Sequence, residues 1–278
     1  MKKYIEVNKR RWDELADLHF KGKFYNVEEF KKGGISLSNL EVNEVGDVRG
    51  KKLLHLQCHF GKDTLSWARL GAQVTGVDFS GRAIALAKQL SAEIGINATF
   101  IQSDIYELDR TSLESHSFDV VFTSNGAIYW LPDLKAWARF ISYYLKPSGI
   151  FYILDSHPTG NIFDDECEDE LRIRYPYFHQ DKPLEFDAEG SYADEDIRLT
   201  NIKEYGWMHD LGSITNNLIE AGLRIEFIHE FPFISWRMLP FLEKKEDGWW
   251  HLPERFQKIP LTFSLKAIKT PVKRSKDE

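Results

Sequence analysis

Short apolar runs alternate with amphipathic stretches over most of this chain, and the alternation predicts a sheet covered by helices. Each run is long enough for one buried strand; the runs lie at residues 53–56, 73–78, 98–102, 118–123 and 150–154. Between them, apolar residues recur at the spacing of a helix face, as in Ala83, Leu86 and Leu90. Strands that alternate with helices form a largely parallel sheet with helices on both faces. We therefore predict an α/β fold.

The same pattern divides the chain into parts. The stretch 159–204 is polar and rich in turn residues, whereas apolar runs at 223–228 and 260–267 return to the strand pattern and bring the sheet to seven strands. We expect a doubly wound, mostly parallel sheet with an N-terminal helical cap and an inserted lid. The predicted parts are a cap at 1–50, a sheet domain at 51–158 and 205–268, a lid at 159–204 and a tail at 269–278.

The first two predicted strands carry the strongest indication of a ligand. The first strand runs into a turn that contains Gly61 and then into a helix, and the second strand ends at Asp78. This order is typical of a mononucleotide-binding half of a doubly wound sheet. The turn brings backbone N–H groups and a helix N-terminus close to a ligand, and the carboxylate can accept hydrogen bonds from ribose hydroxyls. The third strand is followed by a second carboxylate, Asp104, so we expect an adenosine-containing ligand.

Composition narrows the class of protein. The net charge of -7 argues against broad electrostatic attraction to nucleic acid. No apolar run reaches the roughly 18 residues that span a bilayer, and the charged start lacks the apolar centre of a signal peptide. The two cysteines, Cys58 and Cys167, do not form a disulfide framework or a zinc-binding cluster. We expect a cytoplasmic protein without membrane, nucleic-acid or metal partners.

Five motifs, taken in order, resemble those of class I S-adenosylmethionine-dependent methyltransferases of the small-molecule type (methyltransferase type 11-like). They occupy Leu54–Gly61, Gly76–Ser80, Ser103–Ile105, Phe118–Val121 and Leu145–Gly149. The strands at 223–268 look like the antiparallel terminal hairpin of that family, and together these parts cover a little over half of the chain. The resemblance implies S-adenosylmethionine as the cofactor.

The resemblance also implies which residues bind the cofactor. The turn from Gln57 to Gly61 would face its methionine part, Asp78 would hold the ribose, and Asn125 would lie near the transferred methyl group. Phe79, Asp104 and Ile105 would contact the adenine. The implied cofactor-binding residues are Gln57, Cys58, His59, Gly61, Asp78, Phe79, Asp104, Ile105 and Asn125.

The chain departs from the family in the first turn. It has His55 where the family usually has an acid, and Gln57 and His59 where the family has glycines that permit positive φ. We expect the His59 side chain to turn from the site and bond locally; a catalytic base or a ligand is the alternative. Cys58 is expected to be a small buried apolar residue.

For the reaction, the resemblance implies in-line displacement, in which the protein aligns the acceptor with an activated methyl group. Such positioning can supply roughly 7–11 kcal/mol. A general base is needed only if the acceptor carries a proton, and the candidates are His157 and His209, with a structural role as the alternative for each. The predicted substrate-pocket residues are Tyr25, Tyr129, Trp130 and Trp207.

Several questions stay open on the sequence alone. The cap could cover the cofactor or pack on the sheet edge, and the aromatic connection at 231–256 could line a substrate pocket or form a homodimer interface. The loss of two loop glycines leaves a non-catalytic S-adenosylmethionine-binding protein as an alternative. A nicotinamide-dependent oxidoreductase is disfavoured because the three-glycine fingerprint is absent, and a nucleic-acid methyltransferase because of the acidic charge.

Overall fold

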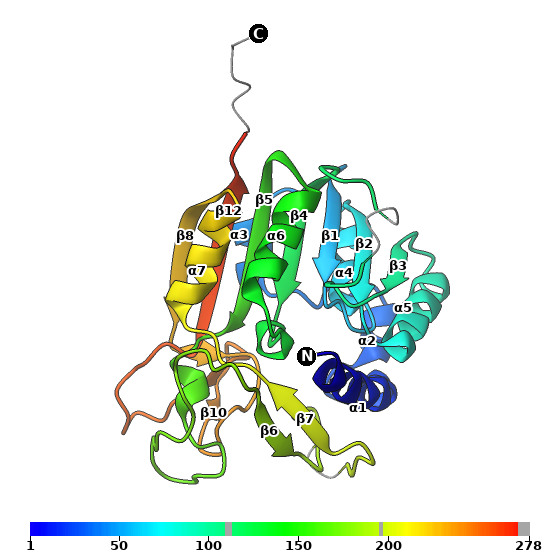
Figure 1. Ribbon diagram of the computed structural model, residues 1–278. Helices are drawn as coiled ribbons and strands as arrows, with labels where there is room; N and C mark the ends of the chain where they lie inside the picture. Colours follow the sequence, from blue (N-terminus) through cyan, green and yellow to red (C-terminus); the bar gives the residue numbers. More distant parts are fainter. Residues whose placement is uncertain (109–112, 195–196, 272–278) are drawn as a thin grey trace.

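A seven-stranded sheet forms the centre of the protein (Figure 1). The structure is a computed structural model that describes residues 1–108, 113–194 and 197–271, so most of the predicted tail lies outside the described residues. The strand order is β3-β2-β1-β4-β5-β12-β8, and within this sheet β12 alone runs opposite to the other six strands. The strands are β1 (Lys52–Leu56), β2 (Gln73–Asp78), β3 (Thr99–Gln102), β4 (Phe118–Ser124), β5 (Leu145–Ser156), β8 (Leu223–Phe231) and β12 (Thr262–Lys269). The predicted doubly wound, mostly parallel sheet is confirmed.

Helices cover both faces of this sheet. They are α1 (Lys2–Lys21), α2 (Val27–Lys31), α3 (Asn39–Val45), α4 (Lys62–Arg69), α5 (Gly81–Glu93), α6 (Leu134–Tyr144) and α7 (Leu211–Glu220), with short 3-10 turns at η1 (Ile128–Trp130) and η2 (Gly160–Ile162). Side chains of Ser80, Asp133 and Asp210 cap α5, α6 and α7 by accepting backbone N–H groups of the first turn. No helix within the described ranges is long and apolar enough to span a membrane.

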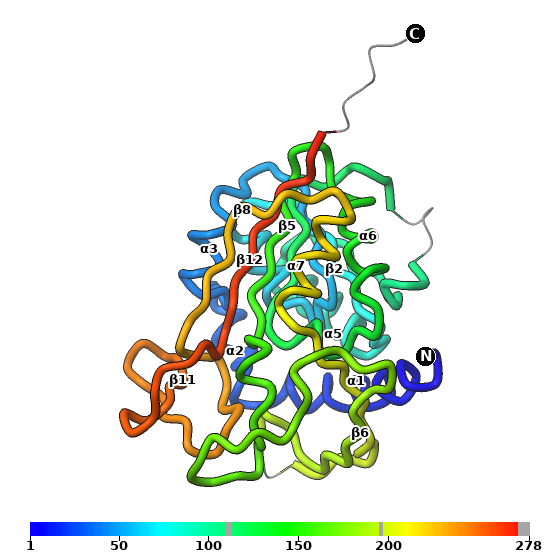
Figure 2. The backbone as a smooth tube through the Cα atoms, turned by 60° about the vertical axis from the view of Figure 1, so that its left-hand side comes forward, coloured from blue at the N-terminus to red at the C-terminus, as the bar shows by residue number. Residues whose placement is uncertain are grey.

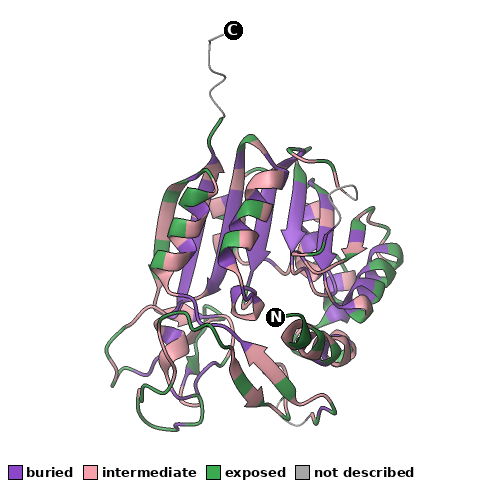
Figure 3. Ribbon diagram, in the orientation of Figure 1, coloured by how far each residue is buried: buried purple, intermediate pink, exposed green. Residues whose placement is uncertain are grey.

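The apolar runs are buried because neighbouring residues of each strand face opposite layers. Leu54 and Leu56 of β1 pack in the layer of α6 and α7, whereas Leu53 packs with Trp67 of α4 on the other face. Figure 3 shows the central strands as the most continuously buried part of the chain. Strands buried on both faces explain why these runs are apolar throughout instead of alternating.

The segment after β5, predicted as an inserted lid, lies at the carboxyl end of the sheet (Figure 1). Its strands β6 (Leu184–Asp187) and β7 (Lys203–Gly206) pair along their whole length. A second small sheet joins β9 (Phe233–Ile234), β10 (Glu243–Lys244) and β11 (Trp250–His251), and it shares an apolar cluster with Phe163 of the lid. The aromatic connection therefore adds to the lid.

The first helix holds the lid in place. Asn8 donates to the Tyr205 carbonyl (2.7 Å) and accepts from the Tyr205 N–H (2.8 Å). The buried Arg11 guanidinium donates to carbonyls at Ala188 (2.6 Å) and Gly190 (3.1 Å). It also pairs with Glu204 (2.9 Å). Figures 1 and 2 show α1 crossing the end of the sheet beside β6 and β7.

The opposite side of α1 is fixed to the sheet domain. Asp13 accepts hydrogen bonds from the Ser80 hydroxyl (2.6 Å) and the Arg82 N–H (3.0 Å), and Asp17 pairs with the Arg82 guanidinium (2.6 Å). One helix therefore connects the lid to α5.

Gly61 occupies the tightest position in the turn after β1, and we predict that Gly61→Ala destabilises the fold by about 2–4 kcal/mol. The left-handed φ of 75° costs an L-residue about 1–2 kcal/mol, and an added Cβ would lie 2.6 Å from the Phe100 ring. Gly95→Ala is the matched control, because Gly95 has a φ of 67° with nothing within 4 Å. Denaturant titration would measure both variants; equal losses would contradict the steric argument.

Candidate functional site

A cavity of about 960 Å³ lies between the carboxyl ends of β1 to β4, helix α1 and the lid. It is the place where the crevice of an open α/β sheet is expected. All nine residues predicted to bind a cofactor line it, and so do Tyr25, Tyr129 and Trp130. The structure thus brings twelve of the fifteen predicted site residues to one cavity.

Asp78 joins two turns at the floor of the cavity. Its carboxylate accepts the His59 N–H at 2.8 Å and the Ser80 N–H at 2.8 Å, one at each oxygen. Burial raises the pKa of this carboxyl to about 6. Since each oxygen accepts only one of these bonds, each keeps a lone pair for a ligand hydroxyl.

The second carboxylate lies on the neighbouring strand end, as predicted. Asp104 follows β3 and accepts the Tyr106 N–H at 3.0 Å. Burial raises the pKa of the Asp104 carboxyl. Ile105 and Phe79 line the same side of the cavity and provide apolar surface beside the two carboxylates.

The turn after β1 keeps the backbone of a glycine turn without two of its glycines. Gln57 and His59 both have left-handed φ values, 52° and 50°, and Gly61 follows at 75°. The turn therefore differs from a glycine turn in its side chains and keeps the left-handed backbone angles. Both side-chain amide atoms of Gln57 are buried without a hydrogen-bond partner among the described residues, and Gln57 lines the cavity.

Asn125 is placed by a third buried carboxylate. Asp155, at the end of β5, accepts the N–H groups of Gly126 (2.7 Å), Ala127 (2.9 Å) and Ile128 (3.2 Å). These bonds hold the turn that carries Asn125, which has a φ of 45°. The side-chain carbonyl of Asn125 accepts from Ser235 of the aromatic connection at 3.4 Å.

Two histidines and a serine form a hydrogen-bonded chain beside the cavity. His59 Nε2 lies 3.1 Å from His19 Nδ1, and His19 Nε2 lies 2.7 Å from the Ser191 hydroxyl of the lid. Burial lowers the pKa of His19 to about 4 and that of His59 well below its usual value. Both rings are therefore neutral at ordinary pH. Cys58, next to His59, is buried as expected, and burial raises the pKa of its thiol.

Aromatic side chains form the wall opposite the carboxylates. Trp12 of α1 contacts Trp130 edge to face, with ring centroids 5.2 Å apart, and Trp130 contacts Tyr129 in the same way at 5.1 Å. Tyr25 and Tyr192 of the lid join through their hydroxyls, and both rings contact His19. These rings make the wall apolar with few polar atoms, as in most small-molecule sites.

One predicted pocket residue lies elsewhere. Trp207 is buried and does not line the cavity; its ring packs edge to face on Tyr4 at 6.2 Å. The backbone N–H of Trp207 donates to the Tyr129 carbonyl at 2.8 Å. Trp207 follows β7, and its side chain packs on Tyr4 at the start of α1, whereas Met208 lines the cavity.

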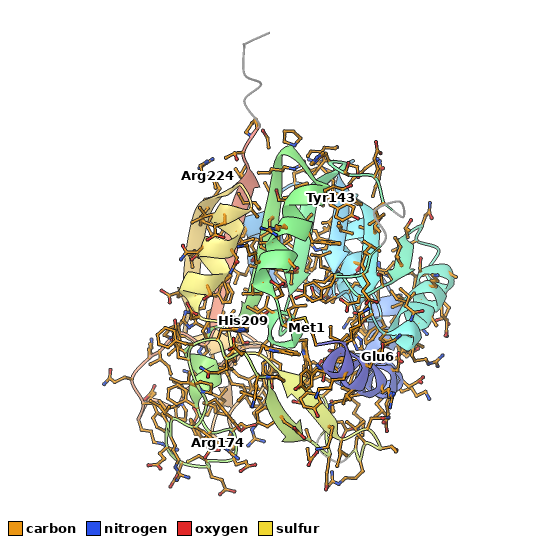
Figure 4. The ribbon with its side chains drawn as sticks, viewed as in Figure 1. Met1, Glu6, Tyr143, Arg174, His209 and Arg224 are labelled. Carbon is orange, nitrogen blue, oxygen red and sulfur yellow. The ribbon has the colours of Figure 1, made fainter. Side chains whose placement is uncertain are left out.

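The two histidines predicted as general bases also lie outside the cavity. His157 is buried, its Nδ1 accepts the Thr159 N–H at 3.0 Å, and its Nε2 lies 2.8 Å from Glu230. His209 donates from Nε2 to the Leu131 carbonyl at 2.7 Å, and burial lowers its pKa to about 4. Figure 4 shows His209 where the sheet domain meets the lid. Both side chains thus lie away from the cavity: His209 joins its segment to Leu131, and His157 bonds to its own turn and to Glu230.

Several cavity residues escaped prediction. On α1, Arg11 and Trp12 line the cavity, and both Arg11 and His19 bond to the lid. Tyr192 of the lid and Trp236 of the aromatic connection line the cavity as well. A signal for the first helix was present: residues 8, 12, 15 and 19 recur at helical spacing and so share one face. The lid residues had no comparable signal, because their sequence neighbours are irregular.

His209→Ala should lower the free energy of unfolding by about 1–3 kcal/mol, since the buried Leu131 carbonyl would lose its donor. Thermal and denaturant unfolding would measure the loss. The control is His229→Ala on the exposed side of β8, which should change stability far less. Full stability of His209→Ala would show that the hydrogen bond is dispensable.

The sequence of this chain is similar to those of known proteins. A family described as "Methyltransferase domain" matches residues 47–195. Two ubiquinone biosynthesis O-methyltransferases are similar to this chain: that of Citrobacter koseri is 29% identical over 57% of this chain and 60% of its own length, and that of Vibrio campbellii is 30% identical over 54% and 58%. The chain thus spans less than two thirds of the length of these curated relatives.

Solved structures share the fold over a larger part of the chain. An S-adenosylmethionine-dependent methyltransferase from Mesorhizobium loti has a TM-score of 0.58 at 20% identity, covering 86% of this chain and 100% of that one. Another from Clostridium acetobutylicum has a TM-score of 0.55 at 12% identity, covering 94% and 99%. At such identities the likeness establishes the fold.

Proposed function

We propose that this chain, which belongs to the methyltransferase domain family, binds S-adenosylmethionine and transfers its methyl group to a small-molecule acceptor. The observation that carries the proposal is the pair Asp78 and Asp104, which lie at the ends of adjacent strands and line one cavity with the Gly61 turn. Two carboxylates in this arrangement suit the ribose and the adenine of one adenosine.

The residues present fit this cofactor. Asp78 has a free lone pair on each oxygen for a ribose hydroxyl, and Phe79 and Ile105 offer apolar surface to a base. The unpartnered amide of Gln57 provides donors and an acceptor for the amino-acid end. Buried polar groups normally have partners, so an unpartnered amide in a cavity wall indicates a ligand.

The protein's own contribution to the reaction is alignment and exclusion of water. S-adenosylmethionine supplies a methyl group that its sulfonium already activates. Helix α1, held to the lid by Asn8 and Arg11, closes the cavity over the strand ends. The wall of Trp12, Tyr129 and Trp130 orients an acceptor within the remaining space.

The acceptor is proposed to be a small organic molecule that is methylated on oxygen. A cavity of about 960 Å³ lies at the upper end of the range for small-ligand sites, about 300–1,000 Å³. The similarity to O-methyltransferases supports oxygen as the acceptor atom. The homodimer predicted from the aromatic connection and the cytoplasmic location stay predictions.

A nicotinamide enzyme is a poorer fit to the same sheet. The usual dinucleotide-binding sheet has the order 3-2-1-4-5-6 with parallel strands. Here the antiparallel β12 inserts between β5 and β8. The turn after β1 also keeps a single glycine, Gly61.

Cofactor binding should weaken as the pH falls below about 6. Burial raises the pKa of Asp78 to about 6, and the ionised form accepts two hydroxyl hydrogen bonds, whereas protonation removes acceptor capacity. Calorimetry with S-adenosylmethionine should give an affinity that falls up to about tenfold per pH unit below this value. Asp78→Asn should bind at least about tenfold more weakly at pH 7.5 and lose the pH dependence, whereas the exposed control Asp47→Asn should match the wild type. Unchanged affinity of Asp78→Asn would remove the assignment.

Methyl transfer itself is tested with methyl-labelled S-adenosylmethionine and a metabolite extract. We expect label to move into a small organic product. Retention of all label on a tightly bound cofactor would favour the alternative, a non-catalytic binding protein.

A further inference from the structure

We propose that His59 is the general base of the reaction and that His19 relays the proton it takes toward Ser191 of the lid. This inference rests on the proposed function and adds a substrate class: acceptors that lose a proton on methylation, such as a phenol. It assigns a role to the His59 side chain, which the turn geometry alone would explain only as a replacement for glycine.

The geometry is that of a proton relay. The Ser191 hydroxyl, the ring of His19 and the ring of His59 follow one another at 2.7 and 3.1 Å. Each imidazole uses one nitrogen toward each neighbour, and the last nitrogen of the chain, His59 Nδ1, has no partner among the described residues. A relay with one open end beside a ligand cavity can accept a proton there.

Tyr25, the acids and the other histidine of the cavity are less suited. Burial raises the pKa of Tyr25, so its hydroxyl stays protonated. Asp78 and Asp104 are assigned to the cofactor. The remaining described acids and histidine of the cavity wall are each held by another side chain; these are Asp63, Asp165, Glu189, Glu204 and His55.

The backbone at His59 is a second, independent argument. A residue other than glycine at a φ of 50° costs about 1–2 kcal/mol. Such strain persists where the side chain has a task. The backbone N–H of His59 already donates to Asp78. Glycine would make that bond equally well, so the bond does not account for a strained histidine. We therefore assign the strain to the role of the imidazole.

The chemistry balances without another reactant. As the acceptor oxygen bonds to the methyl carbon, the carbon–sulfur bond breaks and its electron pair stays on sulfur. The O–H proton passes to His59 Nδ1, the proton on His59 Nε2 passes to His19 Nδ1, and the positive charge lost by the sulfonium remains on the histidine pair. A weak base suffices, because an oxygen that is being methylated becomes strongly acidic.

The surroundings keep the pair neutral before reaction. Arg11 of α1 disfavours a charge on His19, and burial disfavours a charge on either ring. The groups that face the pair are Arg11 on the same helix, Tyr25 after it, Asp78 at the end of β2 and Tyr192 in the lid. A base must be unprotonated to act, and this environment provides that.

The relay requires one tautomer, which nitrogen NMR can read without an acceptor. In protein labelled with ¹⁵N-histidine and saturated with S-adenosylmethionine, two-bond correlations at pH 7 should show His59 Nδ1 bare and Nε2 protonated. A protonated Nδ1, or a doubly protonated ring, would overturn the proposal. If calorimetry shows no cofactor binding, the proposed function fails and the relay fails with it.

Kinetics test the base directly. The probes are catechol and 4-nitrocatechol, of which the second is already largely ionised at neutral pH. His59→Gly should lose roughly 100- to 10,000-fold in kcat with catechol. It should lose far less with 4-nitrocatechol, and added imidazole should restore part of the catechol rate.

The exposed His229→Asn, outside the cavity, is the matched control and should behave as the wild type with both probes. Equal losses of His59→Gly with both probes, without imidazole rescue, would assign His59 a purely structural role. If the wild type binds cofactor but labels neither probe, or if His59→Gly does not fold, the NMR tautomer decides the proposal.

Discussion

The carboxylate of Asp78 is the contact on which the cavity depends. It accepts one N–H from the turn after β1 and one from the turn after β2, so the two loops that form the cavity floor are joined through one side chain. Burying a carboxylate is unfavourable, and the raised pKa of Asp78 expresses that cost. Hydrogen bonds from two backbone N–H groups offset part of it while leaving lone pairs for a ligand. The same group therefore shapes the site and remains available to it.

Helix α1 extends this constraint to the lid. Asp13 connects the helix to Ser80, two residues beyond Asp78, and Arg11 on the lid side holds carbonyls of the irregular segment after β6. Few backbone groups in the described part of this segment pair with one another, and the buried Arg11 guanidinium, which has several donors, binds its carbonyls instead. Because His19 lies on the same helix, the contact that places the lid also places Ser191 against the histidine pair.

The sequence predicted the parts of the site that follow from local rules. Strands buried on both faces are apolar throughout, so their ends could be located, and Asp78 and Asp104 at those ends met in one cavity. His157, His209 and Trp207 could not be placed in this way. Whether each faces the cavity depends on contacts made far away in the chain, such as Trp207 with Tyr4 and His209 with Leu131. The link from His19 to Ser191 spans 172 positions and had no local signal.

The two positions at which this turn lacks glycine depend on both local and distant constraints. At Gln57 and His59 the backbone retains the left-handed turn that glycine adopts without strain, and Asp78 fixes that turn from outside. Once a distant carboxylate determines the backbone, a side chain can be accommodated there at the cost of local strain. The Gln57 amide and His59 Nδ1 then have no hydrogen-bond partner among the described residues, and both residues line the cavity. In a protein interior such atoms are rare, and a bound ligand would provide the partners that the fold itself does not supply.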